Sequence, residues 1–263
     1  MNRIKQLFEQ KKENILSIYF TAGYPSLNNT LDIAEALEKA GADFLEIGIP
    51  YSDPLADGPV IQNSSLKSIE NGMTVKVLFE QLKDLRKRVS IPVLLMGYVN
   101  PILQYGVENF CSSCKEVGVD GLIAPDLPMY EYEEMYSGCF EGNGLSNIFL
   151  ITPQTSDERI RKIDALSNGF IYLLSSSSTT GKDVSLSDVT ENYFSRIRNM
   201  NLKNPTMIGF GISDNKSFLK ASEYANGAIV GSAFVKLLGE DNYMDKISGF
   251  IAALKNEKQS VMN

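Results

Sequence analysis

Eight short apolar segments rich in β-branched and aromatic residues recur along the chain, separated by stretches with helical periodicity. Each segment is apolar throughout instead of alternating, as expected of a parallel strand covered on both faces. Eight strand–helix units in 263 residues predict one (β/α)8 barrel domain over residues 1–263, with a doubly wound open sheet as the alternative. The expected strands are 15–21, 44–49, 93–98, 121–124, 148–152, 170–175, 207–210 and 228–230.

Helical patterns lie between these segments. Apolar residues recur at three- and four-residue steps over 75–85 and 247–254, so one face of each expected helix is apolar. Three serines stand where helices are expected to begin and to accept a backbone N–H, namely Ser26, Ser156 and Ser213. Gly41 and Gly118 stand where helices are expected to end.

The composition excludes several kinds of site. The chain has no histidine, which removes Ser-His-Asp and Cys-His catalysis, histidine-ligated zinc and haem. Cys111 and Cys114 have metal-like spacing, but Cys139 is the third and last cysteine, so a four-cysteine zinc site fails. We expect these cysteines to be reduced and Cys111 and Cys114 to lie one helical turn apart.

The charge pattern argues against two classes of partner. The formal net charge is -7 and no Lys/Arg cluster stands out, so we expect neither nucleic acid nor a membrane as a partner. No apolar run is long enough to span a bilayer, and the first 14 residues lack a signal-peptide core. A cytoplasmic location is therefore expected.

Two carboxylates near the second expected strand are candidates for acid–base chemistry. Glu46 lies inside the apolar strand, where a lone acid is rarely found without a use. Asp57 follows in a loop that contains Pro50, Pro54 and Pro59, and this loop must fold back if both acids are to meet one substrate. Alternatively, Glu46 is a buried acid paired with a cation, although neither neighbouring strand offers one, and Asp57 is an ordinary turn residue.

Glycines at the ends of the last two expected strands suggest an anion site. Gly211 follows the seventh strand, and Gly231 with Ser232 follows the eighth, where a helix beginning at Ser232 would direct its positive end at an anion. Barrels frequently bind phosphate with the loops after strands seven and eight. From its residues alone, the chain reads as a barrel enzyme that acts on a small phosphorylated substrate with paired carboxylates.

Other positions near strand ends leave alternatives open. The small polar loop 175–183 is either a lid over the substrate or an idle flexible loop. Tyr98 and Tyr172 either face the site or pack in the core, and Asp126 either caps a loop or reaches the site. No lysine falls within an expected strand, which disfavours a Schiff-base aldolase, and no carboxylate cluster suggests a metal.

These motifs resemble the α subunit of tryptophan synthase almost end to end. The segment LEIGIPYSDPLADGPVIQ (45–62) is highly specific to that family. The weaker motifs occur in the family's order, namely FTAGYP (20–25), MGYVNP (96–101), PDLP (125–128), the loop 172–181, GFGIS (209–213) and VGSA (230–233).

The resemblance implies a (β/α)8 barrel that cleaves indole-3-glycerol phosphate to indole and glyceraldehyde 3-phosphate. It places the two catalytic acids on Glu46 and Asp57. We expect burial to keep Glu46 neutral and a wetter loop to keep Asp57 ionised. The remaining implied substrate contacts are Tyr98, Tyr172, Thr180, Gly181, Phe210, Gly211, Gly231 and Ser232, of which the glycines and Ser232 would bind the phosphate.

The resemblance also implies a partner, the pyridoxal-phosphate-dependent β subunit, in an α2β2 complex, with no cofactor or metal in this chain. The implied docking surface lies around Asp53 and residues 100–101. The sequence departs from the family's common pattern at residues 178–179 of the lid and at Tyr130. Two other functions stay open at this point: an interaction module that mainly activates a partner, and a free-standing lyase that releases indole.

Overall fold

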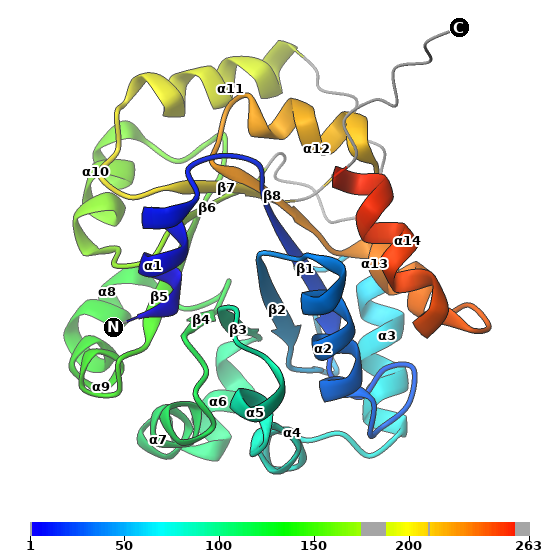
Figure 1. Cartoon of the computed structure of the whole chain (residues 1–263). Helices are drawn as coiled ribbons and strands as arrows, with labels where there is room; N and C mark the ends of the chain where they lie inside the picture. Colours follow the sequence, from blue (N-terminus) through cyan, green and yellow to red (C-terminus); the bar gives the residue numbers. More distant parts are fainter. Residues whose placement is uncertain (1, 175–187, 210, 256–263) are drawn as a thin grey trace, which may run out of the picture.

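The computed structural model describes residues 2–174, 188–209 and 211–255, without the side chains of 188–190, and its strands form a closed barrel (Figure 1). All eight strands are parallel and follow one another in chain order. The last strand pairs with the first, so the barrel prediction is confirmed and the open sheet is wrong. The strands are β1 (Ile15–Thr21), β2 (Phe44–Gly48), β3 (Val93–Met96), β4 (Gly121–Ile123), β5 (Ser146–Ile151), β6 (Ile171–Leu174), β7 (Thr206–Gly209) and β8 (Gly227–Val230).

Helices connect the strands and surround the barrel (Figure 1). No described helix is long and apolar enough to cross a membrane. The helices are α1 (Arg3–Gln10), α2 (Thr30–Ala40), α3 (Pro59–Glu70), α4 (Val75–Leu82), α5 (Leu85–Arg88), α6 (Val99–Tyr105), α7 (Val107–Val117), α8 (Met129–Glu131), the π-helical turn η1 (Tyr132–Tyr136), α9 (Ser137–Gly142), α10 (Asp157–Leu166), α11 (Asp188–Asn199), α12 (Asn215–Ser222), α13 (Ser232–Leu238) and α14 (Tyr243–Lys255).

Two apolar layers explain why the strands are apolar throughout. One layer lies between the barrel and the helices and contains Leu16 and Ile18 of β1 with Leu37 of α2. The other fills the barrel interior, where Ile15 of β1 and Phe44 of β2 pack together with residues of the remaining strands. Each strand contributes side chains to both layers, so neither of its faces is wetted.

Helix α1 closes the N-terminal end of the barrel. Its side chains Ile4 and Phe8 belong to the interior layer, and the Phe8 ring lies 5.9 Å from the ring of Phe170. The side chain of Asn2 caps the helix by accepting the backbone N–H of Ile4. This apolar filling leaves the opposite, C-terminal end of the barrel for polar side chains.

The predicted helix starts are partly confirmed. Ser156 caps α10 through its side chain, as expected. Ser26 does not, because α2 begins four residues later, so that prediction is wrong. The prediction for Ser213 is wrong by one position. Asp214 caps α12 and forms a capping box with Ser217.

The predicted helix ends are confirmed, and the predicted apolar faces are largely buried. Gly41 and Gly118 end α2 and α7 in the left-handed conformation, with φ of 101° and 82°. The helix expected over 75–85 is two helices, α4 and α5, whose Leu78, Leu82 and Leu85 are buried. Of the apolar face expected over 247–254, Ile247, Ile251 and Leu254 are buried in α14 and Phe250 is partly buried.

Candidate active site

Alternation along β2 directs Glu46 into the barrel. Phe44, two residues earlier, belongs to the interior layer, and Glu46 shares its face of the strand. The side chain is 0 % exposed. Ser17 donates its hydroxyl to Oε1 of Glu46 at 3.1 Å, and Oε2 has no hydrogen-bond partner among the described residues.

This environment favours the neutral form of Glu46. Burial raises its pKa from the ordinary 4.5 to about 8, and the hydrogen bond from Ser17 acts in the opposite direction. The expectation that burial keeps this acid protonated near neutral pH is therefore supported.

Asp57 lies in the loop between β2 and α3, and its position is fixed from two sides. The Tyr98 hydroxyl donates to Oδ2 of Asp57 at 3.2 Å and itself accepts the backbone N–H of Ala56 at 2.9 Å. Gln62 of α3 donates its amide to the carbonyl oxygen of Asp57 at 2.8 Å and to that of Pro54 at 3.3 Å. The loop thus folds back over the strand end, as the pairing of the two acids requires.

The prediction of a wet environment for Asp57 is wrong. Its side chain is buried, with 9 % of the residue exposed. Burial raises its pKa from 3.8 to about 6, against the lowering effect of the Tyr98 hydrogen bond. The order of the two acids nevertheless matches the expectation, because Asp57 still ionises at a lower pH than Glu46.

Two interior tyrosines connect the acids electrostatically. Tyr19 and Tyr172 both have strongly raised pKa values, first because of burial and then because the charges of Asp57 and Glu46 act on them. Glu46 stands opposite Tyr19 in the register of β1 and β2, and Tyr19 lines the same cavity as Asp57, so the two carboxylates border one region of the barrel interior around Tyr19.

Glycines provide the space for these tyrosine rings. A Cβ on Gly48 would come within 2.2 Å of the Tyr19 hydroxyl oxygen, and a Cβ on Gly209 within 2.0 Å of the Tyr172 hydroxyl oxygen. Real Cβ atoms do not approach other atoms so closely, so any side chain at either position would displace a ring.

Sequence reasoning missed Ser17 and Tyr19. The signal was present in β1, where Ser17, Tyr19 and Thr21 are polar or amphipathic at every second position. Thr21 continues this interior row and pairs its hydroxyl with that of Ser64 on α3 at 2.6 Å. The alternation was overlooked because β1 was interpreted as apolar throughout.

A narrow cavity adjoins Asp57 at this end of the barrel. Its volume is only about 10 Å³, and aromatic rings form part of its wall. The rings of Tyr51 and Tyr98 lie 5.1 Å apart. The cavity is lined by Tyr19, Ile49, Tyr51, Pro54, Asp57, Ser65, Met96, Gly97, Tyr98 and Pro125.

The glycines expected at the phosphate site stand at strand ends. Gly211 has φ of 77° just after β7, and Gly231 precedes α13, which begins at Ser232 as predicted. A Cβ on Gly231 would lie 3.5 Å from the Tyr19 ring, so this strand end lies against Tyr19. Thr180, Gly181 and Phe210 lie outside the described residues, as does the lid segment 175–187.

The remaining candidates have structural or surface positions. Asp126 has a capping role, because its carboxylate accepts the backbone N–H of Val99, the first residue of α6, at 2.9 Å. Asp53 and Tyr130 are exposed. Cys111 and Cys114 are buried free thiols of α7. Within the described ranges, no group of three potential ligand side chains could hold a metal ion.

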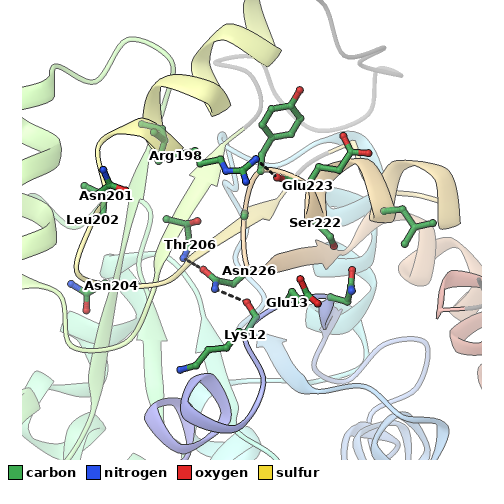
Figure 2. Close-up of a pocket in the computed structure, with 15 residues that line it drawn as sticks. Lys12, Glu13, Arg198, Asn201, Leu202, Asn204, Thr206, Ser222, Glu223 and Asn226 are labelled. Carbon is green, nitrogen blue, oxygen red and sulfur yellow. Dashed lines mark hydrogen bonds between the residues drawn. The ribbon is translucent and has the colours of Figure 1, made fainter.

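An open cleft of about 690 Å³ lies at the opposite end of the barrel (Figure 2). Asn226, which precedes β8, forms part of it. Its amide donates to the carbonyl oxygen of Lys12 at 2.7 Å, and its Oδ1 accepts the backbone N–H of Thr206 at 2.9 Å. These hydrogen bonds connect the start of β8 with the start of β7 and with the segment before β1. This agrees with the stabilising role of this end of a barrel.

Comparison with known proteins points to one family. The family model described as "Tryptophan synthase alpha chain" matches residues 5–262. The tryptophan synthase alpha chain of Flavobacterium psychrophilum is 59% identical over 254 residues, which cover 97% of this chain and 100% of that protein. The corresponding protein of Phocaeicola vulgatus is 53% identical, again with 97% and 100% covered.

Solved structures agree as well. Tryptophan synthase subunit alpha from Legionella pneumophila str. Paris superposes with a TM-score of 0.86 at 34% identity, over 97% of each chain. A chain of tryptophan synthase from Mycobacterium tuberculosis superposes with a TM-score of 0.87 at 28% identity, over 96% of each chain. On the matched length, the identity and the shared barrel, the chain belongs to the tryptophan synthase alpha chain family.

Proposed function

We propose that Glu46 and Asp57 are the two acids with which this chain cleaves indole-3-glycerol phosphate. As a member of its family, the chain is a lyase of tryptophan biosynthesis that converts this substrate to indole and glyceraldehyde 3-phosphate. The observation that carries the assignment is that two buried carboxylates of different pKa border one region at the C-terminal end of the barrel.

Glu46 moves the proton. Its neutral form donates to C3 of the indole, which weakens the bond between C3 and C1′. The carboxylate so formed then accepts the proton of the C1′ hydroxyl as that bond breaks and the aldehyde forms. The electron pair of the broken bond restores the aromatic indole, and Glu46 ends protonated as it began.

Asp57 stabilises the positive charge that develops in between. Protonation at C3 leaves the ring nitrogen electron-poor, and an ionised carboxylate that accepts the N–H hydrogen bond lowers the energy of this intermediate. A pKa of about 6 keeps Asp57 ionised at neutral pH, while a pKa of about 8 keeps Glu46 neutral. The two environments therefore separate the two roles.

The other substrate contacts follow the family pattern. Gly181, Gly211, Gly231 and Ser232 would bind the phosphate through backbone N–H groups and a hydroxyl. The substrate's ring would lie among Tyr98, Tyr172, Thr180 and Phe210. The position of Gly231 beside Tyr19 supports this arrangement, since it places the end of β8 next to this interior tyrosine.

A β subunit is the expected partner, and we propose an α2β2 complex in which pyridoxal phosphate belongs to the β subunit and this chain needs no cofactor. The surface that we assign to docking includes the exposed loop around Asp53 and the start of α6 at residues 100–101. We place the complex in the cytoplasm, because its substrates are intermediates of amino-acid biosynthesis.

Turnover of the Glu46→Gln and Asp57→Asn variants tests the proposal. Loss of a general acid lowers rates by about 10²–10⁴, so Glu46→Gln should nearly abolish formation of glyceraldehyde 3-phosphate. Glu70→Gln, on the exposed surface of α3, is the matched control and should retain full activity. Near-normal turnover of Glu46→Gln would refute its role. Assays with and without the β subunit separate a lyase from a module that only activates its partner.

A further inference from the structure

Ser17 is a buried serine whose hydroxyl hydrogen-bonds to Glu46. Ser17 stands opposite Phe44 in the register of β1 and β2, while Glu46 stands opposite Tyr19. The serine therefore lies one interior layer closer to the apolar end of the barrel than the acid. Its hydroxyl donates to Oε1 of Glu46 at 3.1 Å, and both residues are 0 % exposed.

This hydrogen bond makes the two oxygens of Glu46 different. Oε1 is held by the Ser17 hydroxyl, whereas Oε2 has no partner among the described residues. A proton on the neutral acid is better placed on Oε2, because Oε1 already accepts a hydrogen bond. The serine thus restricts both the orientation of the carboxyl group and the site of its proton.

We propose that Ser17 is a positioning residue for the cleavage reaction, whose hydroxyl fixes Oε1 of Glu46 so that Oε2 carries the proton to and from the substrate. The inference rests on the proposed role of Glu46 and deepens it. Ser17 acts through the acid and makes no substrate contact of its own. The arrangement separates an anchored oxygen from a reactive one within a single carboxyl group.

The surroundings of Glu46 make the effect of this hydroxyl measurable. The titratable groups that act on the same region are Tyr19 on β1, Tyr172 on β6 and Asp57 in the loop after β2. Burial raises the pKa of Glu46, and the Ser17 hydrogen bond lowers it. Removing the hydroxyl should therefore raise this pKa further and extend the range of pH in which the acid stays neutral.

The test compares three variants of the full chain. Ser17→Ala removes the hydroxyl and Ser17→Thr keeps it. Ser146→Ala is the matched control, because it removes a buried serine of β5 whose hydroxyl accepts a hydrogen bond from the side chain of Asn2. For each, kcat and KM for indole-3-glycerol phosphate are measured across the pH range, and the free energy of unfolding is measured over the same range.

We expect Ser17→Ala to lower kcat about tenfold with KM unchanged, because it removes a hydrogen bond to the carboxylate that Glu46 becomes during the reaction. The alkaline limb of its kcat profile, which reports loss of neutral Glu46, should move to higher pH. Ser17→Thr should restore both properties, and Ser146→Ala should change neither. The pH range over which the free energy of unfolding falls should also extend upward in Ser17→Ala, a readout that does not need activity.

Two results would overturn the inference. The first is a Ser17→Ala variant with the parent's kcat and pH profile, because Ser17 would then only support the fold. The second is an equal loss in Ser17→Thr and Ser17→Ala, because the hydroxyl would not be the cause. An active Glu46→Gln variant would instead refute the proposed function itself, so the two failures are distinguishable.

Discussion

Replacing Glu46 with glutamine is expected to stabilise the protein increasingly as the pH rises from about 5 to about 8. The folded protein binds the Glu46 proton with a pKa of about 8, whereas the ordinary value is 4.5. In the parent, the stability associated with this proton is complete below the lower value and is lost as the pH rises through the higher one. Glutamine does not titrate, so the difference between variant and parent isolates this effect.

The magnitude follows from the size of the pKa shift. Each pH unit within this interval changes the free energy of unfolding by about 1.4 kcal/mol. Between pH 5 and pH 7 the variant should therefore gain about 2 to 3 kcal/mol relative to the parent. For a chain of this size that is roughly 5 to 10 °C in melting temperature. The buried amide of glutamine adds a contribution that does not vary with pH, so the slope and not the offset carries the information.

Urea unfolding at a series of pH values measures this slope. Asp57, whose pKa is also raised, is present in both proteins, and its contribution cancels in the difference. Glu70→Gln, an exposed carboxylate paired with Lys67, controls for the loss of one negative charge and should show no such slope. A difference between Glu46→Gln and the parent that stays constant from pH 5 to pH 8 would show that Glu46 is not held neutral by burial.

Three further outcomes are expected. Asp57→Asn should lower kcat about 10²-fold, since an amide cannot balance the developing positive charge, and parent activity in this variant would reduce Asp57 to a turn residue. Tyr98→Phe should move the acid limb of the kcat/KM profile upward from about pH 6, because the Tyr98 hydroxyl lowers the pKa of Asp57; an unmoved limb would mean that another group causes it. Gly209→Ala should destabilise the protein by about 1–3 kcal/mol or more, because the new methyl group would lie 2.0 Å from the Tyr172 hydroxyl oxygen; an unchanged melting temperature and KM would show that the ring is not packed there.

Local rules recovered the strands and several helix limits. Parallel strands covered on both faces must be apolar throughout, and the positions of Gly41 and Gly118 follow from the left-handed conformation that ends a helix. The rules failed where two residues compete for one role. Ser213 is as good a cap as Asp214, but only Asp214 has a reciprocal partner in Ser217.

The amino-acid sequence by itself determined the barrel, the burial of Glu46 and the presence of a second acid within reach, because strand periodicity and loop composition are local properties. Only the tertiary structure decided that Asp57 is also buried, that Ser17 anchors one oxygen of Glu46, and that Tyr19 lies close to both acids. Solvent exposure and the partners of a side chain depend on residues from other strands and loops, and these meet only when the chain folds.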